Sequence, residues 1–148
     1  MLSTDDGLRR ITELASQENW LAVLVTTRAD GQPSVSVVNA GILPHPATGS
    51  PVVGLVSAGG TAKLRNLRTT PSATLVFRAG WQWVAVTGPT ELAGPDDPHS
   101  YELPTLLRDI YHAAGGSHPD LDEYDREMAA DRRAAVLLTP TRFTTNPG

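Results

Sequence analysis

Residues 51–92 read PVVGLVSAGGTAKLRNLRTTPSATLVFRAGWQWVAVTGPTEL, and this stretch contains the elements that decide the fold. It begins with an apolar, β-branched run that predicts a strand and is followed by the pair Gly59-Gly60. A short helix is expected over 61–70, because two leucines share one of its sides and Pro71 cannot continue it. A turn and a short helix therefore join the first strand of this stretch to the next one.

The second half of the same stretch predicts a β-hairpin. Residues 72–78 alternate in their side chains, and residues 81–92 form a second β-rich run. Gly80 lies between them and tolerates the backbone angles of a tight turn. We therefore expect the two runs to pair antiparallel.

Three further runs bring the number of predicted strands to six. Residues 20–27 and 33–42 flank Asp30-Gly31, a hairpin turn signal, and residues 134–139 form the last run. Helical patterns occur near the N-terminus and in inserts, from residue 4 to about 17, from 104 to 114 and from 121 to 128. Because strands and helices do not alternate, this order predicts a small closed or partly closed antiparallel barrel rather than a doubly wound sheet.

The composition excludes several classes of protein. With 148 residues, 40% of them hydrophobic, the chain has room for a single domain, 1–148. The absence of cysteine rules out thiolate catalysis, cysteine-ligated zinc and iron–sulfur clusters. A formal net charge of -4 argues against general nucleic-acid binding. The four histidines show no metal-ligand spacing, so no metal site is expected.

The ends of the chain and its apolar runs bear on localisation. The N-terminal segment lacks the basic-then-apolar layout of a signal peptide. No apolar run approaches the roughly 20 residues that span a bilayer. We expect a soluble, cytoplasmic protein with no membrane partner.

The segment from Val56 to Arg68 outlines an anion-binding site. A strand ends, two glycines allow close approach of the backbone, and a helix begins whose first amides have no intrahelical partners. Thr61 adds a hydroxyl, while Lys63 and Arg65 add positive charge that can reach the same point. The alternative, from spacing alone, is a capped helix with a solvated basic face.

Motifs spread along the chain resemble those of a known family. They are TAKLRNL at 61–67, PSATLV at 71–76, GWQWVAVTG at 80–88, the pair Tyr124 and Met128, and Asp131-Arg132-Arg133. Together they resemble the pyridoxine 5′-phosphate oxidase-like split-barrel flavoproteins and, within them, branch B of the mycobacterial deazaflavin-dependent oxidoreductases, which use coenzyme F420. The resemblance implies a mainly β (α+β) fold, namely a six-stranded antiparallel split β-barrel, FMN-binding-like, with peripheral helices.

The resemblance also implies a homodimer with two equivalent cofactor sites in clefts between the protomers. Lys63 and Thr61 match the positions that hold the cofactor phosphate, although close relatives carry an arginine in place of Thr61. The other implied cofactor-binding positions are Arg65 and Asn66 in the same motif, Ser57 at the strand end, and Ser36, Val38 and Asn39 along the isoalloxazine-like ring. Trp81 shares one phase of its strand with Trp83, and such aromatic residues either border a flat ring or pack in a core or dimer contact.

We therefore expect an F420H2-dependent reductase that transfers hydride between the deazaflavin and an unsaturated small molecule. The alternatives are an FMN-binding oxidoreductase and a non-catalytic F420 carrier. No catalytic residue stands out, and no Gly-x-Ser-x-Gly elbow supports hydrolysis. Arg132 and Arg133 either reach an acidic part of the cofactor or are solvated. The loops at 43–51 and 94–98 and the partner protomer are expected to determine the substrate.

Overall fold

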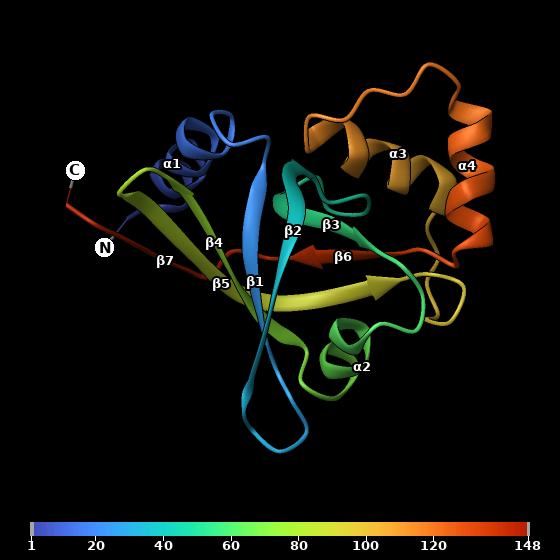
Figure 1. Cartoon of the computed structure of the whole chain (residues 1–148), viewed down its shortest axis with the longest axis horizontal. Helices are drawn as coiled ribbons and strands as arrows, with labels where there is room; N and C mark the ends of the chain where they lie inside the picture. The colour runs from blue at the N-terminus through green and yellow to red at the C-terminus, as the bar shows by residue number, and fades with distance from the viewer. Residues whose placement is uncertain (1, 148) are drawn as a thin grey trace.

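The structure, a computed structural model, describes residues 2–147, in which six antiparallel strands close into a barrel and a seventh is added to it (Figure 1). The strands are β1 (Leu21–Thr27), β2 (Pro33–Pro44), β3 (Pro51–Ser57), β4 (Ser72–Ala79), β5 (Gln82–Ala93), β6 (Ala134–Leu138) and β7 (Arg142–Thr145). Around the barrel the order is β4-β1-β2-β3-β6-β5, and pairing of β4 with β5 closes the ring. The prediction of a six-stranded antiparallel split barrel is confirmed.

Within residues 2–147, four helices lie outside the barrel (Figure 1). They are α1 (Thr4–Ala15), α2 (Ala62–Thr69), α3 (Leu103–Ala113) and α4 (Leu121–Ala130). The side chains of Ser3 and Asp120 accept hydrogen bonds from first-turn amides of α1 and α4, so both act as N-caps. No helix among these residues has the length and apolar character that crossing a bilayer requires.

Backbone conformation explains where several strands begin and end. Gly31 and Gly80 have φ of 86° and 58°, left-handed angles that glycine adopts at low cost in the two hairpin turns. Asn19 and Trp20 also adopt left-handed angles, with φ of 56° and 59°. Strand β1 consequently begins at Leu21, and the sequence-based boundary at Trp20 was one residue too early.

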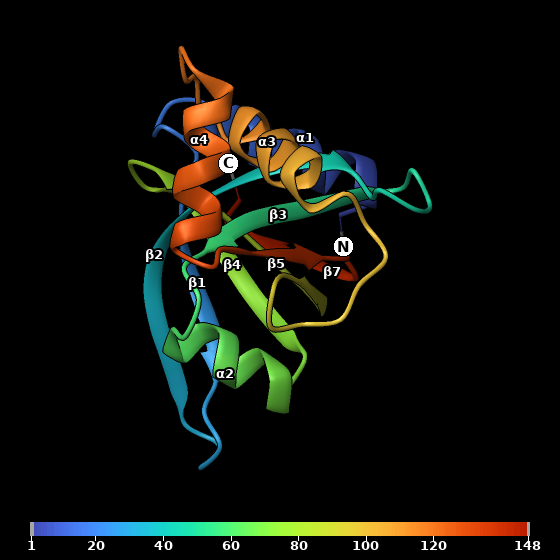
Figure 2. The ribbon, with the colours of Figure 1, turned by 90° about the vertical axis from the view of Figure 1, so that its right-hand side faces the viewer.

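The barrel interior holds the main apolar core. Leu24, Leu75 and Phe77 are buried there, because alternate residues of each strand point inward, and α1 adds Ile11 to the same cluster. Strands β3 and β6 are buried on both faces, since α3 packs its apolar side over their outer surface. This packing fixes α3 and α4 beside the C-terminal end of β3 (Figure 2).

The seventh strand is not among the six that the sequence pattern predicted. Strand β7 pairs with β5, with Phe143 opposite Val86, and the Phe143 side chain is only 5% exposed. A Cβ on Gly7 of α1 would lie 2.4 Å from the Phe143 ring, so the helix and the ring are in close contact. A single apolar residue marks this strand, which is why the sequence pattern did not indicate it.

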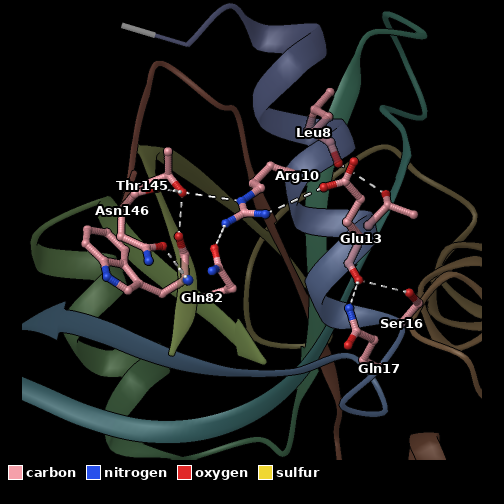
Figure 3. A network of polar contacts seen from close by, with 10 residues as sticks. Leu8, Arg10, Glu13, Ser16, Gln17, Gln82, Thr145 and Asn146 are labelled. Atoms are coloured by element: carbon pink, nitrogen blue, oxygen red, sulfur yellow. Dashed lines mark hydrogen bonds and ion pairs between the residues drawn. The ribbon is translucent and has the colours of Figure 1, made fainter. Parts of the chain in front are cut away.

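Polar contacts attach β7 to α1 and β5 (Figure 3). Arg10 donates hydrogen bonds to Gln82 Oε1 and, at 3.4 Å, to Thr145 Oγ1. The Thr145 hydroxyl donates to the Trp83 carbonyl oxygen at 2.6 Å, and the Trp83 amide donates to Asn146 Oδ1 at 2.9 Å. The C-terminal segment is therefore part of the folded structure.

Candidate functional site

The site forms at the junction of β3 and α2 (Figure 2). Gly60 has φ of 76°, a left-handed angle that strongly favours glycine. A Cβ on Gly59 would lie 2.8 Å from the Arg132 carbonyl oxygen, and the Gly59 amide donates to the Asp131 carbonyl oxygen at 3.0 Å. The two glycines thus allow the chain to turn directly against the backbone that precedes β6.

Thr61 occupies the N-cap position of α2, but its hydroxyl bonds elsewhere. Thr61 Oγ1 lies 2.8 Å from Ser57 Oγ, and within residues 2–147 its side chain caps no first-turn amide. The Thr61 side chain therefore accepts no hydrogen bond from those amides and places no charge at the positive end of the helix dipole. Such a helix N-terminus is suited to an anion.

A cavity of about 440 Å³ lies beside this junction. It is lined by Val37, Val38 and Asn39 of β2, by Val56, Ser57, Ala58, Thr61 and Lys63 of the β3–α2 junction, by Ile110, Tyr111 and Ala114 of α3 and its C-cap, by Tyr124 and Met128 of α4, and by Arg133. A volume of this size lies within the range of small-molecule sites.

The cavity brings together several residues predicted from the sequence. These are Ser57, Thr61, Lys63, Val38 and Asn39. Asn39 also supports the wall, because its Nδ2 group donates to the carbonyl oxygens of Asn19 at 2.9 Å and of Ala114 at 3.1 Å. No ion pair joins Lys63 to another of the described residues, so its ammonium group is left to pair with a ligand.

Arg65 and Asn66 lie on another side of α2. They line a separate, charged hollow together with Arg28 and Ser34. Arg65 donates to the Gly60 carbonyl oxygen at 2.7 Å, and Asn66 donates to the Thr26 hydroxyl at 3.2 Å. Both side chains therefore hold the helix in place, and neither lines the cavity that contains Lys63.

Ser36 and Trp81 also lie outside this cavity. Ser36 is half-buried in the ladder opposite Leu24 of β1. Trp81 is 94% exposed at the β4–β5 turn, on the part of the barrel that packs beside α1 (Figure 1). Any contact of either residue with a cofactor remains a prediction.

An aromatic wall, which the sequence patterns did not assign to the site, faces the β3–α2 junction. The ring centroids of Tyr111 and Tyr124 are 4.7 Å apart. Burial, together with the nearby Tyr111, raises the pKa of Tyr124 to about 12, and its hydroxyl donates to the Leu107 carbonyl oxygen at 3.3 Å. The Tyr111 hydroxyl donates to the Ser117 carbonyl oxygen at 3.2 Å. The only sequence signal for this wall was the motif pair of Tyr124 with Met128.

The lining has a positive charge balance. Lys63 and Arg133 contribute cations, and no described residue of the lining is acidic. This contrasts with the formal net charge of -4 for the chain and indicates an anionic ligand. Among residues 2–147 there is no group of three or more His, Cys, Asp or Glu side chains that could hold a metal ion.

Comparison with known families gives one match. The model of the family described as pyridoxamine 5′-phosphate oxidase matches residues 10–146. A search of curated proteins finds no match.

Solved structures share the fold at low sequence identity. A heme binding protein from Mycobacterium smegmatis has a TM-score of 0.67 and 16% identity, with 99% of this chain and 56% of that chain covered. An F420 reductase has a TM-score of 0.59 and 18% identity, with coverage of 85% and 90%. A pyridoxamine 5′-phosphate oxidase-related, FMN binding protein from Nostoc punctiforme has a TM-score of 0.58 and 15% identity, with coverage of 98% and 85%. At these identities the similarity shows the fold and does not identify the cofactor.

Proposed function

The chain belongs to the pyridoxamine 5′-phosphate oxidase family, and from this premise we propose that it is a homodimeric, F420-dependent oxidoreductase. It transfers hydride between the deazaflavin and an unsaturated small molecule. The observation on which the proposal rests is the cavity in which the Lys63 ammonium group, the start of α2 and an apolar wall meet.

One end of this cavity is suited to the cofactor phosphate. Lys63 supplies a positive charge, the start of α2 supplies backbone amides, and the paired Ser57 and Thr61 hydroxyls supply further hydrogen-bonding groups. A hydrogen bond between charged groups contributes about 1.5–3 kcal/mol. These groups recognise phosphate whether the ring system belongs to F420 or to FMN.

The rest of the lining is suited to a flat ring. Val38, Val56 and Ile110 provide apolar surface, and Tyr111 and Tyr124 add aromatic rings. The hydroxyls of both tyrosines donate to backbone carbonyl oxygens, so the rings serve as packing surface. Apolar walls with a few polar groups that fix orientation are typical of cofactor sites.

A bound deazaflavin would supply a hydride-carrying carbon, and the protein's contribution is to bind, orient and exclude water. Lys63 and the α2 amides anchor one end of the ligand, and the α3 and α4 side chains cover the ring. The raised pKa of Tyr124 keeps its phenol protonated at neutral pH. Since this proton is already bonded to a backbone oxygen, Tyr124 is not the donor of the proton that accompanies hydride transfer.

The proposal of a homodimer rests on apolar side chains of β1 and β2. Val35 and Val37 are 63% and 67% exposed, and Leu21 is 46% exposed. Exposed apolar clusters on a folded domain favour a protein contact. Val37 also lines the Lys63 cavity, so a second copy that covers β2 would border the same cavity.

Titration of the purified protein with F420, FMN and hemin tests the proposal. We expect F420 to bind most tightly, and reduced F420 to be oxidised when a quinone or enone is added. Tight FMN binding without F420 binding would replace the cofactor assignment with the FMN alternative. F420 binding without turnover of any unsaturated compound would favour a carrier. Tight binding of hemin alone would remove the redox proposal.

A further inference from the structure

Arg132 and Arg133 are neighbours in the sequence, but their surroundings differ. Arg132 is more than half exposed, has φ of 51° and forms an ion pair with Asp96. The Arg133 side chain is 32% exposed, and its Nη2 atom is 3.4 Å from Asp131 Oδ2, near the limit for a hydrogen bond. Its Nε atom is buried and has no hydrogen-bond partner among residues 2–147. Arg133 therefore has donor capacity that the described residues do not use.

A second cavity, of about 290 Å³, lies between α3, α4 and the turn that follows β5. Leu103, Pro104 and Leu107 form its α3 side, and Pro95 belongs to the turn. Met128 and Arg133 line both this cavity and the one that contains Lys63. These two long side chains therefore lie on the boundary that the two cavities share.

The other charges at the second cavity are already paired. Asp125 accepts hydrogen bonds from Arg108 at 2.9 Å and 2.6 Å. Arg132 is paired with Asp96, as described above. Arg133 is thus the cation with the weakest partner in a lining that is otherwise mainly apolar.

We propose that the second cavity binds the substrate, and that the substrate is a small apolar carboxylic acid whose carboxylate is held by Arg133. The Arg133 side chain is 32% exposed and its Nη2 atom makes only the long contact with Asp131, so the guanidinium group can donate to a carboxylate. The apolar body of the acid packs among Leu103, Leu107 and the Met128 side chain. Because Met128 also lines the neighbouring cavity, an unsaturated part of the same molecule can extend toward the bound cofactor. The assignment as substrate rests on the proposed function, whereas binding of the acid does not.

The test uses trans-cinnamate, which is planar and apolar, and its uncharged amide, cinnamamide. Each is titrated into the full-length protein without cofactor, and the backbone amides are followed by two-dimensional NMR. We expect cinnamate to shift the signals of residues 94–98, 103–107 and 128–133 and to bind at least tenfold more tightly than cinnamamide. Shifts confined to the β3–α2 junction, or equal affinity for both compounds, would overturn the proposal.

Three variants assign the effect to particular side chains. Arg133→Gln is expected to weaken cinnamate binding at least tenfold and to leave cinnamamide binding within twofold. Arg132→Gln, the matched control, is expected to change cinnamate binding less than twofold. Ala129→Phe, at an exposed position on the cavity rim, is expected to abolish binding of both compounds. Equal losses in the two arginine variants would contradict the role of Arg133.

Measuring cofactor affinity in the same variants separates this proposal from the proposed function. Ala129→Phe is expected to bind F420 or FMN like the wild type. If the cofactor binds but cinnamate does not, the second cavity is not a carboxylate site and the cofactor proposal stands. If cinnamate binds but no cofactor does, the carboxylate site stands and the cofactor proposal fails. If Arg133→Gln does not fold, Arg133→Lys replaces it, and a loss of cinnamate affinity greater than in Arg132→Gln is still required.

Discussion

Replacement of Lys63 by alanine tests the central feature of the site. Lys63 lies in the first turn of α2 and lines the cavity of about 440 Å³, and no ion pair within residues 2–147 neutralises its ammonium group. Because this side chain is only partly buried, we assign its phosphate contact to the lower part of the range for charged hydrogen bonds, about 1.5–2 kcal/mol. That corresponds to a Kd about 10- to 30-fold weaker. The α2 amides remain, so binding is expected to weaken rather than to disappear.

The assay is a fluorescence titration of wild type and variant with the phosphorylated cofactor and with its phosphate-free counterpart. F420 is compared with its deazaflavin chromophore, and FMN with riboflavin. We expect Lys63→Ala to weaken only the phosphorylated compounds. Arg65→Ala is the matched control, because Arg65 is a cation on the same helix that bonds to the Gly60 carbonyl oxygen. Equal losses in the two variants, or an equal loss for riboflavin, would refute the reasoning.

Three further predictions concern assembly and stability. Val35→Asp combined with Val37→Asp places two charges on the exposed face of β2. We expect light scattering to show a monomer and cofactor titration to show weaker binding, and a dimer that persists would contradict the proposed interface. Phe143→Ala removes the buried ring of β7 and is expected to lower the free energy of unfolding by about 3–4 kcal/mol in urea titrations, whereas a loss below about 1 kcal/mol would mean that β7 contributes little. Glu91 accepts hydrogen bonds from the Tyr101 hydroxyl at 2.6 Å and from His45 Nε2 at 2.8 Å; burial raises the pKa of Glu91, but these bonds outweigh it and lower the pKa below its usual 4.5. The stability that Glu91 contributes is therefore present above pH 4.5 and is lost as the pH falls through the lowered pKa. Tyr101→Phe is expected to reduce the change in the free energy of unfolding between pH 7 and pH 3, measured by circular dichroism, by about 1 kcal/mol or less.

The hairpins and the short helix α2 could be predicted because their signals are local. Gly31 and Gly80 mark turns by the backbone angles that they allow, and Pro71 follows the end of α2. Strand β7 has no comparable signal, since its pairing with β5 and the burial of Phe143 depend on residues far away in the sequence. The length and type of most elements therefore followed from the sequence, and the membership of β7 in the sheet did not.

The candidate site was predictable to the extent that its residues are neighbours on one side of an element. Ser57, Thr61 and Lys63 lie within one strand end and one helical turn, and they line a single cavity. Residues two positions apart on a helix do not face the same way, and Arg65 accordingly lies away from Lys63. The motif alone had grouped these two cations together.

The order of residues along the chain was sufficient to indicate the barrel strands, their turns and a basic helix start after Gly60, because hydrogen bonding and side-chain periodicity act over a few positions. Folding in three dimensions decided that Tyr111, Tyr124 and Arg133 face that helix start, because α3 packs over β3 and β6. It also separated Arg133 from Arg132, since adjacent side chains leave the backbone in different directions: both line the second cavity, but only Arg133 also lines the cavity that contains Lys63.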